Sequence, residues 1–344
     1  MKRIFALFSL LVAVAVLAAC AAPTAAPKEA ATEAPKAGSN FKFGLLTSGP
    51  VNDQGWNQTA YDALKQMEAK LGFQTSNVEL SESPAEFEKA FRDYASQGYN
   101  MVLGHGNQFQ DSALAVAKDY PNTFFFISSS RFFDSNVPNV IGLNSDSSQP
   151  YYVFGLISAM MGKGAGLVGG GDIPPISESF TGFEKGAKSV DPNFKVSITY
   201  IGNWTDVAVA KEAAISQVDA GADFLAPNAN IAGNGVYQAI TEKKVWGFGT
   251  YIPTDQANNF DMAPGRILAN YVNDYGAGLV GLAEQLSKGD WKPTGNIEFG
   301  LKDTKVIYIT FNDKAEKPIP PDVMKAAEEA IQKISSGEIK TLDK

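Results

Sequence analysis

The chain has 344 residues, of which 44% are hydrophobic, so it can fill the core of one large domain or of two ordinary ones. Its single cysteine and single histidine exclude an intramolecular disulfide framework and a structural zinc site built on several such ligands. The 29 basic residues are outnumbered by 37 acidic ones, and the formal net charge of -8 argues against a nucleic acid as partner.

The first twenty residues have the pattern of an export signal. Lys2 and Arg3 precede an apolar run over residues 4–16, and small residues then lead to Cys20. The run is shorter than the roughly 20 residues that a membrane-spanning helix needs, so removal of residues 1–19 is expected. The sequence LAAC at this place resembles the lipobox of bacterial lipoproteins, which implies a lipid on Cys20. The alternative is an ordinary signal peptide in which the cysteine has no such role.

The segment that follows the signal is predicted to be a disordered tether. Residues 21–40 consist mainly of Ala, Pro, Thr, Glu and Lys and contain no large apolar side chain. Such a stretch cannot bury enough apolar surface to offset the entropy lost on ordering. Fully extended, it would reach at most about 65–70 Å from the anchored cysteine.

From Phe41 onward, short apolar or β-branched runs alternate with helical patterns, and turns rich in Gly, Asn and Asp separate them. The first strand is predicted at residues 41–49 and the first helix at 57–72, where Gly72 ends an apolar stripe. The remaining runs of this first series lie at residues 78–80, 83–98, 101–106, 109–120, 123–129 and 139–144.

A second series of the same kind begins near Tyr151. Its apolar runs and helical patterns lie at residues 151–162, 165–171, 179–190, 195–202, 206–221, 223–228, 235–243 and 245–249. The last predicted elements are a long helix over residues 268–286, strands of the second lobe at 297–301 and 305–311, and an amphipathic helix within 320–339.

Two such series predict an α/β protein with two doubly wound, Rossmann-like lobes joined by a hinge. Ligands of such sheets bind at the carboxyl ends of the parallel strands, so the cleft between the lobes is the expected site. We assign residues 41–145 and about 262–290 to the first lobe, and about 146–261 and 291–344 to the second.

The sequence carries no recognisable catalytic motif. It lacks a nucleophile elbow, HExxH, Walker A and kinase signatures, and one histidine allows at most one Ser-His or Cys-His pair. Residues 164–169 match GxGxxG, but the match straddles the start of a predicted strand instead of following one, which favours a turn and an edge of the second sheet. The alternative is that Gly169, Gly170 and Gly171 line the cleft. We therefore expect no catalytic residue, cofactor or metal.

The loop after the first predicted strand is a candidate ligand contact. It brings Asp53, Trp56 and Asn57 to the carboxyl end of that strand. The carboxylate and the carboxamide can hydrogen-bond to a polar ligand, and the indole can stack on a flat one. The alternative is that Asp53 or Asn57 caps the helix and that Trp56 packs on it.

The loop after the third predicted strand is a second candidate. It contains His105, Asn107 and Phe109, and the glycines on both sides of His105 permit close approach of the backbone to a ligand. We interpret Asp111 as the cap of the following helix.

The second lobe offers a matching set of residues. Trp204 follows one predicted strand, and Asn228, Asn230 and Gly233 follow another. One aromatic residue in each lobe can sandwich a planar ring, each stack contributing about 0.5–1.5 kcal/mol beyond the burial of area. The alternative for Trp204 is a place in the core or at the rim.

Five segments carry a likeness to a known family: NDQGWNQTAYDAL, AKDYPNTFF, VPNVIGLN, VGGGDIPPISESFTGFEKGAK and GADFLAPNANIAGNGV. In order and spacing they resemble the basic membrane protein family, lipoprotein substrate-binding components of ABC importers with the type I periplasmic-binding fold. The likeness covers most of residues 41–315. By position, Trp56 and Asn57 match the aromatic residue and the Asn of the family's opening motif. Trp204 matches the aromatic residue of its Y-x-G-x-F-x-D segment, and Gly233 falls in the corresponding loop of the second lobe.

Two departures from the family pattern bear on the ligand. Where members that bind nucleosides have I-G-V-D, whose Asp holds the ribose hydroxyls, Gly249 or Thr250 stands at that place. The Lys expected in the next helix is replaced by Asn273. A purine base or another flat heterocycle is then at least as suitable a ligand as a nucleoside. Thr250, Tyr251 and Asn273 are candidates for a substitute contact.

The resemblance implies an extracytoplasmic protein, lipid-anchored to the cell membrane, that delivers a purine nucleoside, nucleobase or similar heterocycle to an ABC permease and ATPase. Two alternatives remain open. One is a ligand sensor that presents its closed form to a signalling receptor. The other is a surface hydrolase of nucleosides or glycosides that uses acids such as Asp53 and Asp111.

Overall fold

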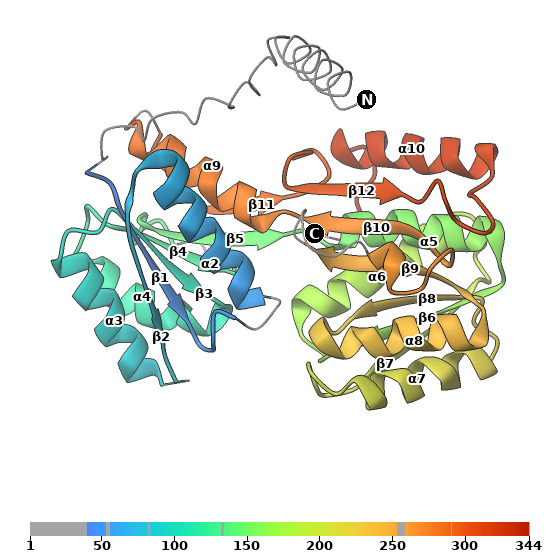
Figure 1. Ribbon diagram of the computed structural model, residues 1–344. Coiled ribbons are helices and arrows are strands. Elements are labelled where there is room, and N and C mark those ends of the chain that lie inside the picture. The colour runs from blue at the N-terminus through green and yellow to red at the C-terminus, as the bar shows by residue number, and fades with distance from the viewer. Residues whose placement is uncertain are drawn as a thin grey trace, which may run out of the picture. The chain divides into compact units, whose positions relative to one another are not determined.

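The computed structural model describes residues 40–52, 56–81, 83–131, 134–252, 259–289 and 291–343, except the side chains of 251 and 252 (Figure 1). The predicted signal peptide, the lipidation site at Cys20, almost all of the tether and the candidate Asp53 lie outside these residues. Within them, the chain forms two six-stranded sheets flanked by helices. The predicted α/β fold with two Rossmann-like lobes is confirmed.

The first sheet has the strand order β11-β5-β4-β3-β1-β2, and its strands run parallel. They are β1 (Lys42–Thr47), β2 (Gln74–Glu79), β3 (Met101–His105), β4 (Phe124–Ser128), β5 (Val140–Ser145) and β11 (Asn296–Phe299). The helices of this first lobe are α2 (Trp56–Gln66), its continuation η1 (Met67–Leu71), α3 (Pro84–Ser96), η2 (Asn107–Phe109), α4 (Gln110–Ala117) and α9 (Tyr275–Ser287), which packs beside α2 (Figure 1).

The second sheet has the order β12-β10-β9-β8-β6-β7, and only its edge strand β12 runs antiparallel. The strands are β6 (Gly164–Gly169), β7 (Lys195–Tyr200), β8 (Phe224–Asn228), β9 (Trp246–Ile252), β10 (Ile267–Asn273) and β12 (Ile307–Phe311). The helices of this second lobe are α5 (Ser148–Met161), α6 (Pro174–Lys188), α7 (Val207–Asp219), η3 (Asn230–Gly233), α8 (Asn234–Lys243), η4 (Asn259–Asp261) and α10 (Pro321–Ser335).

The inner strands are apolar because helices cover both faces of each sheet. In β4, the side chains of Phe125, Phe126 and Ile127 are fully buried although successive residues point to opposite faces. Parallel strands covered on both sides have this continuous apolar pattern. Among the described helices, none has both the length and the apolar character that a membrane crossing requires.

Helices α5 and α6 touch through their backbones. A Cβ atom on Gly186 would lie 1.9 Å from the carbonyl oxygen of Tyr152, and one on Gly182 would lie 2.2 Å from that of Ser148. Only glycine fits at such an approach, because a real Cβ would overlap the oxygen. The two glycines are four residues apart and therefore lie on one face of α6.

The structure differs from the sequence prediction at residues 268–286. The expected single helix is divided into strand β10 and helix α9. All seven residues of β10 are buried, including Asn270 and Asn273, so the strand has no exposed face and no alternation of buried and exposed residues. Helix α9 begins after Asp274, whose carboxylate accepts a hydrogen bond of 2.8 Å from the backbone N–H of Ala277.

The pairing of the late strands also corrects the expected division into lobes. Strand β11 pairs with β5 of the first sheet, with Asn296 opposite Gly142, whereas we expected it in the second lobe. Strand β10 pairs with β9 of the second sheet, although residues 262–290 were assigned to the first lobe. The GxGxxG segment is strand β6, which lies inside the second sheet between β7 and β8 and is not a turn at its edge.

Within the described residues, the chain crosses between the two sheets three times, at residues 146–147, 274 and 300–306. The crossings are hydrogen-bonded to one another. The N–H of Asp146 donates to the carbonyl of Phe299 at 2.8 Å, and the N–H of Asp274 donates to the carbonyl of Val306 at 2.7 Å. The three crossings therefore form one connected hinge.

Replacement of Gly186 by alanine should separate α5 from α6. We expect Gly186→Ala to lower the free energy of unfolding by about 1–3 kcal/mol, since the methyl group has no room beside the Tyr152 carbonyl. Gly281→Ala in α9 is the matched control, because nothing lies within 4 Å of its Cβ position. It should stabilise the protein by about 0.5–1 kcal/mol. Urea titration checks both values, and equal stability of the two variants would contradict the close packing.

Candidate ligand-binding site

Most of the predicted contact residues lie at the carboxyl ends of the parallel strands. In the first lobe, His105 is the last residue of β3, and Trp56 is the first residue of α2, after the loop that follows β1. In the second lobe, Asn228 ends β8, and Trp204 lies in the loop between β7 and α7. These ends are where α/β sheets bind their ligands.

Trp56 and His105 form a stacked pair. Their ring centroids are 4.1 Å apart and the ring planes differ by 18°. The Nε2 atom of His105 donates a hydrogen bond of 2.9 Å to the backbone carbonyl of Trp56, and its Nδ1 atom lies 3.1 Å from the hydroxyl of Ser128. His105 is only 1% exposed, whereas Trp56 is partly exposed. The histidine therefore lies beneath the tryptophan.

Tyr275 completes this aromatic group. Its ring centroid lies 5.6 Å from that of Trp56 and 5.7 Å from that of His105. Burial raises the pKa of the Tyr275 phenol far above its usual value, so the group stays neutral. Sequence reasoning missed Tyr275, because the prediction of one long helix hid the end of β10. Asp274, a residue type that caps helix N-termini, is the sequence signal that could have ended one element and begun another just before Tyr275.

The neighbouring polar candidates of the first lobe, Asn57 and Asn107, lie at the starts of α2 and η2. Asn57 is partly exposed, and its Nδ2 atom would be 3.0 Å from a Cβ on Gly49, so the chain passes close to it after β1. Asn107 is exposed at the start of η2. The side chain of Gln108 donates a hydrogen bond of 2.7 Å to the Ser48 hydroxyl, which ties the loop after β3 to the loop after β1.

Phe109 does not belong with these residues. It is fully buried and packs between α3 and the sheet, with ring centroids 4.1 Å from Phe87 and 6.1 Å from Phe91. Gly104 makes the space, since a Cβ there would lie 2.6 Å from that of Phe109. The expectation that Phe109 lines the cleft is therefore wrong, and its role is in the core of the first lobe.

Trp204 lies over the end of β6. A Cβ on Gly170 would be 2.3 Å from the Cε3 atom of the indole, and one on Gly171 would be 3.2 Å from its Cζ2 atom. The indole therefore rests on glycine backbone, and 38% of the residue remains exposed. The N–H of Ala232 donates to the carbonyl of Trp204 at 3.0 Å, which joins its loop to η3.

Other second-lobe candidates already form internal hydrogen bonds. The Nδ2 atom of Asn228 donates to the Ser179 hydroxyl at 3.0 Å, and the Thr250 hydroxyl donates to the Pro227 carbonyl at 2.7 Å. Gly233 is buried against Pro227. A Cβ atom on Gly233 would lie 3.2 Å from the Cβ atom of the proline. These contacts give Asn228, Thr250 and Gly233 a role in shaping the strand ends, whether or not they touch ligand.

Two buried tyrosine hydroxyls form hydrogen bonds with the backbone at the strand ends of the second lobe. The N–H of Thr250 donates to the Tyr237 hydroxyl at 3.2 Å, and the Tyr151 hydroxyl donates to the Pro227 carbonyl at 2.6 Å. Burial raises the pKa of Tyr237 to about 12 and that of Tyr151 well above its usual value. Both phenols are therefore neutral at physiological pH.

The two family departures have a structural counterpart. A Cβ on Gly249 would lie 1.9 Å from the Oδ1 atom of Asn270, so any side chain at residue 249 would have to displace Asn270. Asn273 lies on strand β10, not on the helix expected from the family pattern, and is 1% exposed. The Ser145 hydroxyl donates to its Oδ1 atom at 3.5 Å, next to the hinge. The side chain of Tyr251 lies outside the described set.

Backbone strain marks two of the same strand ends. In the described part of the chain, three residues other than glycine have positive φ, and two of them follow strands of the candidate site. Ser129 (φ 55°) follows β4, and Asn230 (φ 50°) follows β8. Such strain is found preferentially at functional sites.

An ion-pair cluster joins the two lobes beside these strand ends. The guanidinium of Arg131, after β4, lies 2.6 Å from a carboxylate oxygen of Glu178 on α6 of the second lobe. It also lies 2.6 Å from Glu298 on β11 of the first lobe, which in turn accepts a hydrogen bond of 2.9 Å from Asn144. Sequence reasoning missed this cluster, since its members are far apart in the chain.

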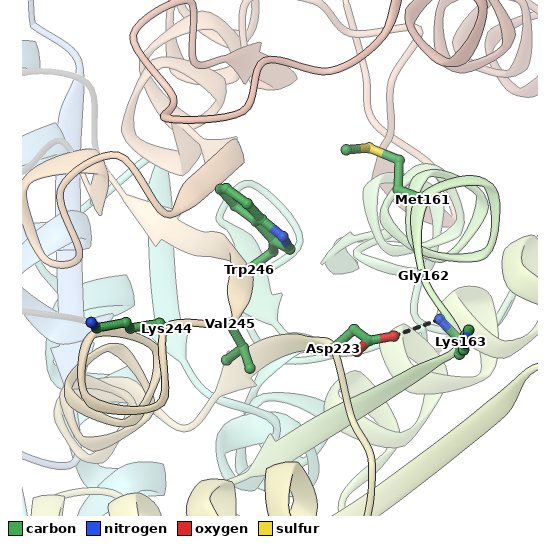
Figure 2. A pocket seen from close by; sticks show the side chains of 7 residues that line it. All are labelled: Met161, Gly162, Lys163, Asp223, Lys244, Val245 and Trp246. Carbon is green, nitrogen blue, oxygen red and sulfur yellow. Dashed lines mark hydrogen bonds between the residues drawn. The ribbon is translucent and has the colours of Figure 1, made fainter.

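A cavity of about 310 Å³ lies at the other end of the second sheet (Figure 2). Its lining residues precede β6, β8 and β9 or begin them, and they are Met161, Gly162, Lys163, Asp223, Lys244, Val245 and Trp246. The carboxylate of Asp223 accepts a hydrogen bond of 2.7 Å from the backbone N–H of Lys163. Because this cavity is at the amino ends of the strands, it is not the expected ligand site.

In the described residues, no group of three or more His, Cys, Asp and Glu side chains is arranged to hold a metal ion.

The chain has two α/β lobes, a hinge of three crossings, and aromatic and amide side chains at the strand ends. This combination is typical of the class of bilobed solute-binding proteins. The chain belongs to the family described as ABC transporter substrate-binding protein PnrA-like, whose model matches residues 41–344. The family resemblance stated from the sequence is confirmed.

Three proteins show how far this likeness extends. A purine-binding protein of Brucella abortus is 26% identical over 303 residues, covering 87% of this chain and 82% of its own. The ABC transporter nucleoside-binding protein BmpA of Lactococcus lactis is 26% identical over 322 residues, covering 88% of this chain and 90% of its own. A solved solute-binding protein from Conexibacter woesei has a TM-score of 0.66 at 24% identity, covering 87% of this chain and 98% of that one, which supports the fold.

The position of Trp204 should depend on Gly170. We expect Gly170→Ala to displace the indole from β6, while costing less stability than Gly186→Ala because a partly exposed side chain can move away. The measurement is the fluorescence of Trp204 in a protein whose Trp56, Trp246 and Trp291 are phenylalanine. A red-shifted emission is the expected result, and an unchanged spectrum would contradict the contact.

Proposed function

We propose that this protein is the extracytoplasmic solute-binding component of an ABC importer and that it binds a purine base or a similar planar heterocycle between its two lobes. The observation that carries the proposal is the placement of one partly exposed tryptophan at the strand ends of each lobe, Trp56 in the first and Trp204 in the second. A flat ligand placed between two such side chains is stacked on both faces.

The names of the relatives support the ligand class. One is described as purine-binding and another as nucleoside-binding. The absence of a carboxylate at Gly249 and Thr250 favours a base over a nucleoside, since the family's nucleoside binders hold the ribose hydroxyls with an Asp at that place. The amides of Asn57 and Asn107, which are exposed or partly exposed, can hydrogen-bond to ring nitrogens and carbonyl groups.

The proposed contacts are of the kind that gives micromolar binding. A micromolar dissociation constant corresponds to about 8 kcal/mol of net binding free energy. Two aromatic stacks at roughly 0.5–1.5 kcal/mol each beyond area burial, several hydrogen bonds at about 0.5–1.5 kcal/mol each and the burial of the ligand's apolar surface all contribute to it, and they must also offset the entropy lost on association.

Hinge closure is the proposed mechanism. The three hydrogen-bonded crossings let each lobe move as a unit, and a ligand that contacts both lobes stabilises the closed form. The pair between Arg131 and Glu178 is a contact that only approached lobes can make, so it would add to that stabilisation. The closed form is then what the permease recognises.

Membrane attachment belongs to the same proposal. A lipid on Cys20 and a tether over residues 21–40 would hold the binding lobes near the permease and its ATPase, at the outer face of the cell membrane.

The ligand class can be tested with a thermal-shift panel followed by calorimetry. Adenine, hypoxanthine, guanine, their ribonucleosides and riboflavin are the compounds to compare. We expect the melting temperature to rise with at least one free base and to rise less with the matching nucleoside, because the acid that would bind ribose is missing. A response to nucleosides alone would contradict the preference for a base, and no response to any purine would contradict the ligand class.

The stacking residues can be tested with the best compound of that panel. Trp56→Ala and Trp204→Ala should each weaken binding about tenfold or more, from loss of one stack and its apolar contact. Trp246→Ala is the matched control, since Trp246 lines the cavity at the other end of the second sheet. Equal affinity in all three variants would mean that the ligand does not lie between the two tryptophans.

The ion pair between the lobes can be tested with Glu178→Gln. We expect a loss of about 0.5–1 kcal/mol in ligand affinity, small because both side chains are partly exposed. Small-angle scattering of the liganded protein should show a larger open fraction. Glu316→Gln is the control, because Glu316 pairs with Arg266 at the same 2.6 Å within the second lobe. If both variants behave alike, the interlobe pair has no part in closure.

A further inference from the structure

We propose that His105 is a positioning residue, which holds the Trp56 indole in the orientation that receives the ligand and does not itself contact the ligand. This inference rests on the proposed function, because it concerns the tryptophan that is expected to stack on the ligand. It also revises the role that the sequence suggested for His105.

The hydrogen bonds of the imidazole leave it no polar atom for a ligand. A carbonyl oxygen can only accept, so the Nε2 atom of His105 carries the proton that it shares with the carbonyl of Trp56 at 2.9 Å. In the neutral ring the Nδ1 atom then accepts from the Ser128 hydroxyl at 3.1 Å. With only 1% of its surface exposed, the His105 side chain is closed off from solvent.

The same ring supports the indole from one side. The stacking distance of 4.1 Å and the angle of 18° bring the two rings into face contact. The imidazole therefore holds Trp56 at two points, its backbone carbonyl and its ring. Tyr275, at 5.6 Å from the indole and 5.7 Å from the imidazole, borders both rings.

The support itself is anchored in the sheet. His105 ends β3 and Ser128 ends β4, two strands that pair directly, and both residues are buried. Trp56, by contrast, begins a helix after a loop and is partly exposed. Fixing an exposed aromatic side chain before the ligand arrives reduces the ordering cost of binding.

The variants His105→Leu and His105→Gln separate positioning from a structural role. Leucine removes both the hydrogen bond and the stack, whereas the glutamine amide can still donate to the Trp56 carbonyl. We expect His105→Leu to weaken binding of adenine or hypoxanthine about threefold to tenfold, and His105→Gln to bind within about twofold of the unaltered protein.

The second readout needs no ligand. In a protein whose Trp204, Trp246 and Trp291 are phenylalanine, Trp56 is the remaining indole. His105→Leu should raise the acrylamide quenching of Trp56 and lower its fluorescence anisotropy. His105→Gln, which can keep the hydrogen bond but loses the stack, should change both less. A purely structural histidine would change the melting temperature while leaving these two properties of the folded protein unchanged.

Two results would overturn the proposal. The first is unchanged quenching and anisotropy of Trp56 in His105→Leu. The second is an equal loss of affinity in His105→Leu and His105→Gln while the Trp56 signals stay unchanged, which would make His105 a direct ligand contact.

If His105→Leu does not fold, Ser128→Ala replaces it, because this variant releases the Nδ1 side of the ring. Ser128→Ala should raise the quenching and lower the anisotropy of Trp56, and unchanged signals would also overturn the proposal. If the unaltered protein binds no purine, the proposed function fails, and the Trp56 fluorescence still decides the role of His105.

Discussion

The hydrogen bonds between the three crossings are the constraint on which the rest of the structure depends. Asp146 is bonded to Phe299 at the end of β11, and Asp274 is bonded to Val306, the last residue before β12, so no crossing can shift alone. Strands β5 and β10 reach the hinge with their carboxyl ends, at Ser145 and Asn273. Because the strands of each sheet are parallel, with β12 as the exception, this brings the carboxyl ends of both sheets to the hinge side, where ligand contacts are expected.

Much of the fold could be predicted from the sequence, because its signals are local. Alternating apolar runs and helical stripes identified the two series of strands and helices, and both sheets formed as expected. Two features could not be read in this way. Strand β10 is buried on all sides, and such a run fits a helix as well as a strand. Strand β11 carries no pattern that tells which sheet it joins, since pairing with β5 is a contact between distant parts of the chain.

The candidate site was predictable to the same extent. The sequence placed Trp56, His105 and Trp204 after predicted strands, and the structure has them at or just beyond strand ends. The depth of a side chain was not predictable, because it depends on packing: Phe109 turns into the core beneath α3, and His105 lies under the indole. The link between Arg131 and Glu178 spans 47 positions and has no local signal.

The contact between α5 and α6 limits how the second lobe can change over evolutionary time. Gly182 and Gly186 face carbonyl oxygens of α5, four residues apart on one side of their helix. A single inserted residue before them would rotate that side by about 100° and turn a larger side chain toward α5. Length variation among relatives should therefore be tolerated in the surface loops and excluded from this pair of helices, whatever molecule each relative carries.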